Sequence, residues 1–287
     1  MQHLIIGYGY CGYHLAQYLL KKKESVTAIS RHLDSIYELE GLNHIQHNIE
    51  EPFHWQKKET IIYYLIPPIG DRSDDVGLKQ FLNHSQLKAT QVIYFGSSGV
   101  YGNHAGAWVD ESSTCYVHSS RQKRRLNAEA QWLTYCQQQQ IPLIILRVGG
   151  IYGVNRLPLQ AAMKQTPVIT PELAPYTNSI YIDDLIKISY LLTQTKSTTS
   201  LYNIADGQPT PVGTLQQLIA QTLGLRAADY ESFEQAWERA SSMKKEFLST
   251  SKRLSIQALK TRLKSTLHLT PLADAVTLSL KLQGLLR

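Results

Sequence analysis

Cysteine is scarce in this sequence, and long apolar runs are absent. The 287 residues include only three cysteines, without CxxC spacing, and ten histidines without metal-ligand spacing. These counts argue against a disulfide framework and a zinc site. No apolar segment is long enough to span a bilayer, and the first residues resemble a strand, so neither a membrane span nor a signal peptide is expected. Together the absences favour a protein of the reducing cytoplasm without a bound metal.

The charge balance is positive but diffuse. Lys and Arg number 29 against 23 Asp and Glu, for a formal net charge of +6. Such a balance suits phosphorylated ligands. Because no basic stripe is interleaved with aromatic residues, we expect no nucleic-acid partner. The chain is long enough for one large α/β domain, or for a domain with a smaller lobe.

The most informative segment is Gly7-Tyr8-Gly9-Tyr10-Cys11-Gly12, which follows the apolar run at 2–6. A short strand that leads into GxGxxG and then into a helix is typical of the phosphate-binding turn of a dinucleotide-binding unit. The helix directs its N–H groups and positive dipole end at the phosphates. A glycine-rich turn without a ligand is the competing interpretation. We expect the dinucleotide to be bound by Gly7, Gly9, Tyr10, Cys11 and Gly12.

The end of the next strand, expected at 25–29, sets the choice of dinucleotide. An NAD site usually has Asp or Glu there, which accepts hydrogen bonds from the ribose 2′-OH. This chain has Ser30-Arg31 instead, and a guanidinium suits a 2′-phosphate. We therefore predict that Ser30 and Arg31 bind the cofactor and that NADP is favoured over NAD. The alternatives are NAD as cofactor, and Arg31 as an ordinary solvated surface residue.

Strand-like and helical segments alternate along the first two thirds of the chain. This alternation predicts an α/β fold, a Rossmann-type doubly wound parallel sheet with a smaller C-terminal substrate lobe. The expected core is 1–153 with 178–206, and the expected lobe is 154–177 with 207–287. Strands are expected at 2–6, 25–29, 43–47, 60–66, 90–95, 141–146 and 201–205. Helices are expected near 11–23, 74–88, 119–138, 183–194, 211–223, 232–246 and 270–282.

A serine pair follows the apolar strand at 90–95, in Gly96-Ser97-Ser98-Gly99-Val100-Tyr101-Gly102. Ligands of an open parallel sheet bind outside the carboxyl ends of its strands. Ser97 is therefore a candidate to hydrogen-bond a substrate carbonyl or hydroxyl. The alternative is a turn serine that bonds its own backbone.

Several dispersed motifs, in this order, resemble the extended short-chain dehydrogenase/reductases, the NAD(P)-dependent epimerase/dehydratase family that acts mostly on nucleotide sugars. The resemblance covers nearly the whole chain. It implies that Ser97 orients the substrate and that Gly150 and Ile151 lie near the nicotinamide. The sequence does not fix the oligomeric state, although the long helices near 74–88 and 119–138 could form the four-helix interface of a homodimer, as in relatives. Besides the glycine loop and the serine segment, the motifs are Trp108-Val109-Asp110-Glu111, Arg147-Val148-Gly149-Gly150-Ile151-Tyr152-Gly153, Ile180-Tyr181-Ile182-Asp183-Asp184-Leu185 and Tyr202-Asn203-Ile204-Ala205-Asp206.

One departure from the family concerns catalysis. Its Tyr-x-x-x-Lys pair is replaced here by Arg121 and Arg125. Arg does not give up its proton in a protein, so Arg121 is excluded as the acid or base. Arg125 can still bond a ribose. The two residues are spaced i, i+4 and can share a helix face, where they would suit a phosphate or carboxylate, although a solvated basic face is the alternative. Other candidates for the proton are Tyr101, Tyr116, Tyr152 and Tyr181.

Two function hypotheses follow from these residues. The first is an NADP-dependent oxidoreductase or epimerase that acts on a nucleotide-sugar-like or other phosphorylated substrate. Ser97 and the intact glycine loop favour it. The second is a non-catalytic NADP(H)-binding sensor or regulatory protein, which Arg121 in place of Tyr favours.

Overall fold

The computed structural model describes residues 1–34, 37–70, 73–195 and 199–286. The chain divides into two compact units. The first unit comprises Met1–Val100, Val117–Val148 and Leu185–Tyr202, and the second comprises Tyr101–Tyr116, Gly149–Asp184 and Asn203–Arg287.

These units divide the chain differently from the boundaries expected from the sequence. The segment Tyr101–Tyr116 lies in the second unit. Its strand β8 (Trp108–Val109) pairs in parallel with β17 (Arg253–Leu254). The Tyr101 hydroxyl also donates to Asn203 Oδ1 at 2.7 Å. Contacts between residues more than a hundred positions apart therefore assign this segment to the second unit.

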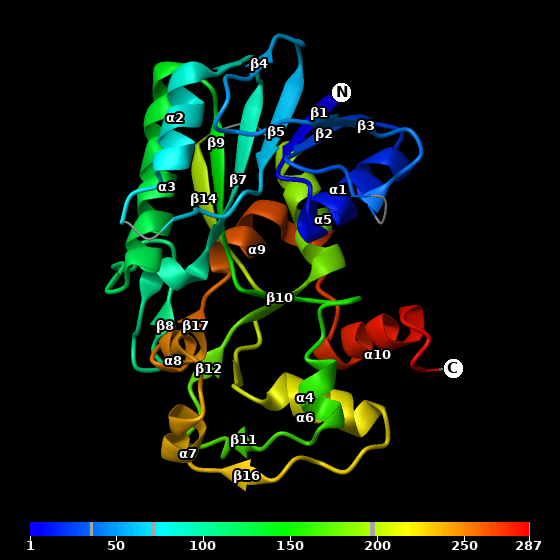
Figure 1. The fold of residues 1–287 in the computed structure, drawn as a ribbon, viewed down its shortest axis with the longest axis vertical. Helices are drawn as coiled ribbons and strands as arrows, with labels where there is room; N and C mark the ends of the chain where they lie inside the picture. Colours follow the sequence, from blue (N-terminus) through cyan, green and yellow to red (C-terminus); the bar gives the residue numbers. More distant parts are fainter. Residues whose placement is uncertain (35–36, 71–72, 196–198, 287) are drawn as a thin grey trace. The chain divides into compact units, whose positions relative to one another are not determined.

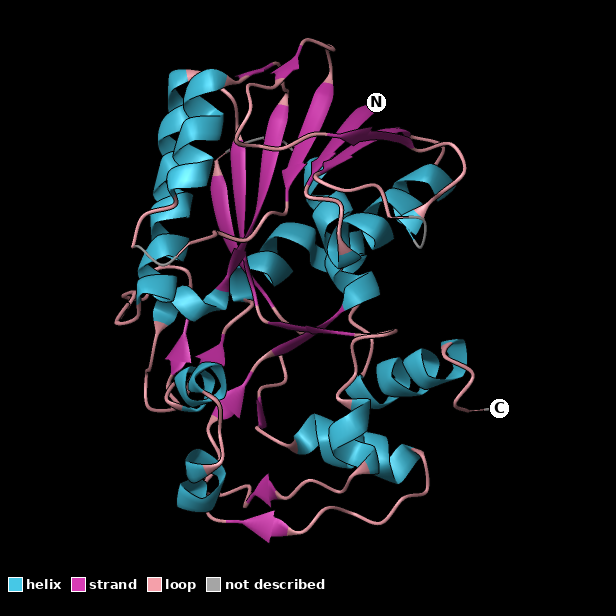
Figure 2. Ribbon diagram, in the orientation of Figure 1, coloured by secondary structure: helices cyan, strands magenta, loops and turns pink. Residues whose placement is uncertain are grey.

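The first unit is built on a seven-stranded sheet, shown as magenta arrows in Figure 2. The strand order is β14-β9-β7-β5-β1-β2-β3, and every pair from β9 to β3 is parallel. The expected Rossmann-type parallel sheet is confirmed. Its strands are β1 (Gln2–Ile6), β2 (Ser25–Ser30), β3 (Asn43–Gln46), β5 (Thr60–Tyr64), β7 (Gln91–Ser97), β9 (Leu143–Val148) and β14 (Ser200–Ile204).

Helices cover both faces of this sheet (Figure 1). Alternate residues of the strands, such as Leu4, Ile62 and Leu143, pack with Phe81 and Trp132 of the helices on one face. The central strands β5 and β9 are apolar over most of their length because helices bury both faces of the sheet. These helices are α1 (Tyr10–Lys21), α2 (Val76–His84), α3 (Ser120–Gln138) and α5 (Ile182–Thr193), and a small pair of strands, β4 (His54–Trp55) and β6 (Gln86–Leu87), accompanies them.

The second unit combines short strand pairs with helices. Its own small core contains Ile169, Ala236 and Leu248. Besides β8 and β17, its strands are β10 (Gly150–Tyr152), β11 (Val168–Ile169), β12 (Tyr176–Thr177), β13 (Ser179–Tyr181), β15 (Thr210–Pro211) and β16 (Tyr230–Glu231). Its helices are α4 (Leu159–Met163), α6 (Thr214–Thr222), α7 (Phe233–Glu238), α8 (Ser242–Leu248), α9 (Gln257–Leu263) and α10 (Leu272–Leu282), with a 3-10 turn at Lys264–Thr266. Another 3-10 turn, Ser98–Tyr101, begins in the first unit and ends at the first residue of the second.

The helix expected at 232–246 is two helices, α7 and α8. Ser232 begins α7 with a capping box, in which its side chain accepts from Gln235 N–H. The Ser241 side chain accepts from Lys244 N–H and begins α8. A second N-cap serine within the apolar pattern starts a new helix, because its hydroxyl satisfies the first-turn donors of that helix.

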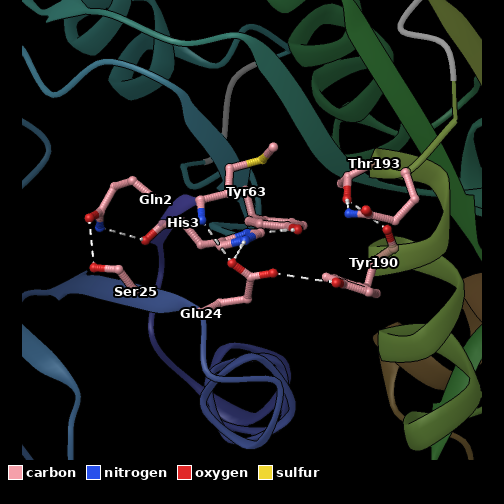
Figure 3. A network of polar contacts seen from close by, with 9 residues as sticks. Gln2, His3, Glu24, Ser25, Tyr63, Tyr190 and Thr193 are labelled. Carbon is pink, nitrogen blue, oxygen red and sulfur yellow. Dashed lines mark hydrogen bonds and ion pairs between the residues drawn. The ribbon is translucent and has the colours of Figure 1, made fainter.

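A buried polar network joins β1, β5 and α5 on the sheet face opposite α2 and α3 (Figure 3). His3 is fully buried, and its Nδ1 lies 3.2 Å from the Tyr63 hydroxyl. Its Nε2 lies 3.6 Å from Glu24 Oε2, and the Tyr190 hydroxyl donates to the other oxygen of Glu24 at 3.4 Å. Burial lowers the pKa of His3 to about 4 despite the opposing charge of Glu24.

This network predicts a pH dependence of folding. The unfolded chain protonates His3 below its ordinary pKa of 6.5, whereas the folded chain protonates it only near about 4. The free energy of unfolding should therefore fall as the pH falls from 6.5 to 4, by up to about 3 kcal/mol from this group. Urea denaturation at pH 7 and at pH 4.5 measures this effect. Between these two pH values, the free energy of unfolding should fall less for His3→Leu than for the wild type. An equal loss in both proteins would contradict this account.

Candidate functional site

The strand order reverses at β1. From β1 the chain moves to β2 and β3 on one side, and then crosses to β5 on the other side. In open α/β sheets, ligands bind outside the carboxyl ends of the strands at such a reversal of strand order. The glycine loop begins at this reversal, directly after Ile6.

Each of the three glycines in the loop lies in a different steric environment, which explains why a side chain is absent there. Gly7 has a φ of +101°, and a Cβ there would lie 2.7 Å from Ile66 Cγ1, so the turn requires glycine. A Cβ on Gly12 would lie 2.8 Å from the Gly7 carbonyl oxygen, so this glycine allows α1 to approach β1 closely. Around a Cβ on Gly9, no heavy atom of the described residues lies within 4 Å. The loop therefore leaves open space at Gly9, where a pyrophosphate needs it.

Helix α1 begins directly beside this space. Gly9 is its N-cap, and Tyr10 and Cys11 form its first turn. The first turn of a helix presents backbone N–H groups and the positive end of the helix dipole, which suit an anion. The buried side chain of Tyr8 holds the loop in place. It is 5% exposed, and its hydroxyl donates to the Tyr37 carbonyl at 2.8 Å. The residues present thus fit a bound dinucleotide.

Ser30 and Arg31 lie at the end of β2, next to the glycine loop. The Gly7 and Tyr8 N–H groups donate to the Ile29 carbonyl, which ties the two segments together. The Ser30 hydroxyl donates to the His32 carbonyl at 2.6 Å. The Arg31 side chain is exposed, and within the described ranges it makes no ion pair with a carboxylate. Its charge is therefore available to a ligand.

Ser97 is the last residue of β7 and is half-buried. Its Oγ accepts a hydrogen bond from the Gly99 N–H at 3.1 Å. This bond is the one expected of a turn serine that bonds its own backbone, the alternative considered for Ser97 from the sequence. It uses one lone pair of the hydroxyl and leaves the O–H group able to donate to a ligand.

The two candidate arginines differ in their surroundings. Helix α3 starts at a capping box, in which the Ser119 side chain accepts from Gln122 N–H. Arg121 in its first turn is exposed, and Arg125 one turn later is half-buried. Burial raises the pKa of Tyr94, and the charge of Arg125 opposes that shift. Arg124, which the sequence did not single out, is 7% exposed.

A buried ion pair links α3 to β9. Arg147 donates through Nε to Glu129 Oε1 at 3.1 Å and through its terminal nitrogen to Oε2 at 2.8 Å. Their exposed fractions are 7% and 5%. This pair could have been predicted from the sequence, because an Arg within the apolar strand Leu143–Val148 needs a buried carboxylate partner. A Cβ on Gly96 would lie 3.3 Å from Glu129 Oε1, so the pair also lies close to the strand end that carries Ser97.

The four tyrosines proposed as proton donors occupy very different environments. Tyr101 is fully buried and donates to Asn203, so its hydroxyl proton is engaged. Tyr116 is 48% exposed. Burial raises the pKa of Tyr152 well above its ordinary value and that of Tyr181 to about 12. Neither buried phenol suits a base near neutral pH.

Asp206 is the last residue of the motif Tyr202–Asp206, and the sequence alone assigns it no role. Burial raises the pKa of its carboxyl to about 6, although it accepts a hydrogen bond from Gln208 N–H at 2.8 Å. Its own N–H donates to the Ser179 carbonyl at 2.7 Å. A carboxyl that titrates near neutral pH is a candidate for proton transfer.

The second unit contains a cavity of about 350 Å³. Gly150 and Ile151 of β10 form part of its wall. Arg156 and Lys244 also line it, and so does Glu231, which is paired with Arg239. Its apolar lining includes Val168, Ile169, Val212, Leu215, Phe247 and Leu248. Apolar walls with a few charged groups are typical of small-molecule sites.

Two features are absent from the described residues. No helix in the described part of the chain is long and apolar enough to cross a membrane. No group of three or more His, Cys, Asp or Glu side chains among the described residues is arranged to hold a metal ion.

No protein-family model and no curated protein matches the chain. Solved structures share its fold. A functionally unknown conserved protein from Silicibacter pomeroyi is 23% identical, with a TM-score of 0.79 over 98% of this chain and 99% of that one. A UDP-glucose 4-epimerase from Thermotoga maritima, solved with UDP-glucose, is 14% identical, with a TM-score of 0.75 over 98% of both chains. A UDP-glucuronic acid 4-epimerase from Bacillus cereus, in complex with NAD, is 20% identical, with a TM-score of 0.75 over 100% of both chains. The fold is thus that of the epimerase structures, as the sequence motifs implied.

The glycine geometry generates a test with a matched pair of variants. Gly9→Val places a side chain in the open space and should weaken NADPH binding at least about a hundredfold, roughly 3 kcal/mol, while the melting temperature stays unchanged. Gly12→Val places its Cβ against the Gly7 carbonyl and should instead lower the melting temperature. Calorimetric titration and thermal melts check both. A Gly9→Val protein that binds NADPH as the wild type does would show that this loop is not the phosphate site.

Proposed function

We propose that this protein is an NADP-binding member of the extended short-chain dehydrogenase/reductases, an oxidoreductase or epimerase that acts on a nucleotide-sugar-like or other phosphorylated substrate. One observation carries the proposal. At the reversal of strand order, the loop has glycine at Gly7 and Gly12 for steric reasons and open space at Gly9. This combination matches what a dinucleotide pyrophosphate needs. The fold shared with the epimerase structures supports it.

The preference for NADP rests on the turn after β2. The exposed Arg31 guanidinium follows Ser30 there, at the position where an NAD site usually has a carboxylate. A guanidinium forms charge-assisted, bidentate hydrogen bonds with a phosphate. The Bacillus cereus epimerase was solved with NAD, so this preference would distinguish the present chain from that neighbour.

The cavity in the second unit supports a substrate with an anionic group. Arg156 and Lys244 bring positive charge to its lining, and pairing with Arg239 offsets the negative charge of Glu231. Its apolar wall suits a ring or another uncharged portion of the same molecule. A sugar attached to a nucleoside diphosphate has both features, as does UDP-glucose in the Thermotoga maritima structure.

Each candidate residue has a proposed role. The cofactor, when bound, supplies hydride transfer at its nicotinamide. Ser97 donates a hydrogen bond from its O–H group to a substrate oxygen, and Arg125 bonds the cofactor ribose in place of the usual Lys. Arg121 supplies positive charge and cannot transfer a proton. Gly150 and Ile151 line the nicotinamide side of the site.

The cofactor preference is tested on Arg31. Arg31→Ala should weaken NADPH binding by about 1–3 kcal/mol, because it removes a charge-assisted contact to the 2′-phosphate. NADH, which lacks that phosphate, should bind the variant and the wild type equally. Calorimetry with both dinucleotides measures this, and equal affinities for NADPH and NADH in the wild type would overturn the preference.

The catalytic roles are tested on Ser97 and Arg121. With the best substrate from a panel of nucleotide sugars, Ser97→Ala should slow hydride transfer at least about tenfold, roughly 1.4 kcal/mol of barrier. Arg121→Ala should slow it much less. Stopped-flow absorbance of the nicotinamide measures both rates. A greater loss with Arg121→Ala would remove Ser97 as the leading catalytic residue.

The second candidate is an NADP(H)-binding sensor without catalysis. The exposed Arg121, which occupies the position of the family's tyrosine, favours it. Tight NADPH binding without hydride transfer to any member of the panel would support the sensor. Hydride transfer with any substrate would exclude it.

A further inference from the structure

A chain of hydrogen bonds connects β3 to the turn that carries Arg31. His44 on β3 lies beside Ala28 of β2, and its Nε2 is 2.8 Å from Ser30 Oγ. The Ser30 hydroxyl donates its only hydrogen to the His32 carbonyl. His44 must therefore donate its Nε2–H to Ser30, because Ser30 has only lone pairs left to offer. One bond joins Ser30 to His32, the residues before and after Arg31, and the other joins Ser30 to β3.

His44 also contacts the glycine loop. Its ring packs edge-on against Tyr8, with 4.6 Å between the ring centroids and 66° between the planes. Tyr8 lies within the loop, between Gly7 and Gly9. One imidazole thus contacts both the loop expected to hold the pyrophosphate and the turn expected to hold the 2′-phosphate. Burial lowers the pKa of His44, so near neutral pH the ring is uncharged.

Hydrogen bonds from β3 and from the residue after it also hold the backbone of the turn. Gln46 donates from its side chain to the Arg31 carbonyl at 3.0 Å, and His47 N–H donates to the Ser30 carbonyl at 2.9 Å. These two bonds fix the backbone. The bond from His44 reaches the Ser30 side chain, whose hydroxyl also donates to the His32 carbonyl, so His44 restrains the position of the serine oxygen.

We propose that His44 is a positioning residue for cofactor selectivity. It acts through Ser30 and holds the Arg31 turn in the geometry that meets the 2′-phosphate. The inference rests on the proposed NADP preference and assigns Ser30 a supporting role. A preorganised contact costs less conformational entropy on binding, so loosening the turn should weaken NADPH binding more than NADH binding.

The test compares Kd values for NADPH and NADH, measured by titrating nicotinamide fluorescence. His44→Leu should reduce the NADPH-to-NADH preference by about threefold or more and leave the Kd for NADH within about twofold of wild type. His44→Gln, whose amide N–H can still donate to Ser30, should keep most of the preference. Ser30→Ala should lose at least as much of the preference, and adding His44→Leu to it should have no further effect, because Ser30→Ala already removes the bond from His44.

Several outcomes would overturn the inference. In one, His44→Leu weakens NADPH and NADH binding equally, which indicates a general structural role. In another, the preference survives in both His44→Leu and Ser30→Ala. If His44→Leu does not fold, Ser30→Ala alone decides. His54→Leu, which changes an exposed histidine on β4, should leave both Kd values unchanged.

The failure of this inference can be told apart from that of the proposed function. A wild-type protein that binds neither dinucleotide, or binds both equally, contradicts the proposed NADP site itself. A wild-type protein that prefers NADPH, with His44→Leu keeping that preference, contradicts only the role of His44.

Discussion

The close approach of α1 to β1 is the constraint on which the candidate site depends. A Cβ at Gly12 would lie 2.8 Å from the Gly7 carbonyl, so only glycine lets the helix begin so near the strand. That approach places the first turn of α1 at the reversal of strand order and leaves the space at Gly9 open. The proposed binding of an anion at this site therefore rests on backbone geometry more than on charged side chains.

The parallel sheet brings together residues that are distant in sequence. Strand ends at Ile6, Ser30 and Ser97 lie along one edge, since all three strands run in the same direction. The buried pair Glu129–Arg147 joins α3 to β9 next to Gly96. Removing one partner would leave a buried charge without compensation, which usually costs several kcal/mol. The pair thus restrains the strand end that carries Ser97.

Much of the fold could be predicted from the sequence, because its strands and helices carry local signals. The apolar runs at 2–6, 25–29 and 60–66 coincide with β1, β2 and β5 to within two residues. The three roles of the loop glycines could also be predicted, since GxGxxG encodes backbone conformation. In contrast, the assignment of Tyr101–Tyr116 to the second unit depends on contacts with Asn203 and β17, which no local pattern reveals. The hydrogen-bond partners of Ser30 lie across the turn and on β3, so no local pattern could indicate its proposed role as a support.

Titration of NADPH with the purified chain, followed by nicotinamide fluorescence, tests the central claim most directly. The account predicts a saturable signal with one NADPH per chain and a lower Kd than for NADH, because a single glycine loop and a single Arg31 turn form the site. A signal that does not saturate with either dinucleotide would contradict it, since the open space at Gly9 would then hold no cofactor.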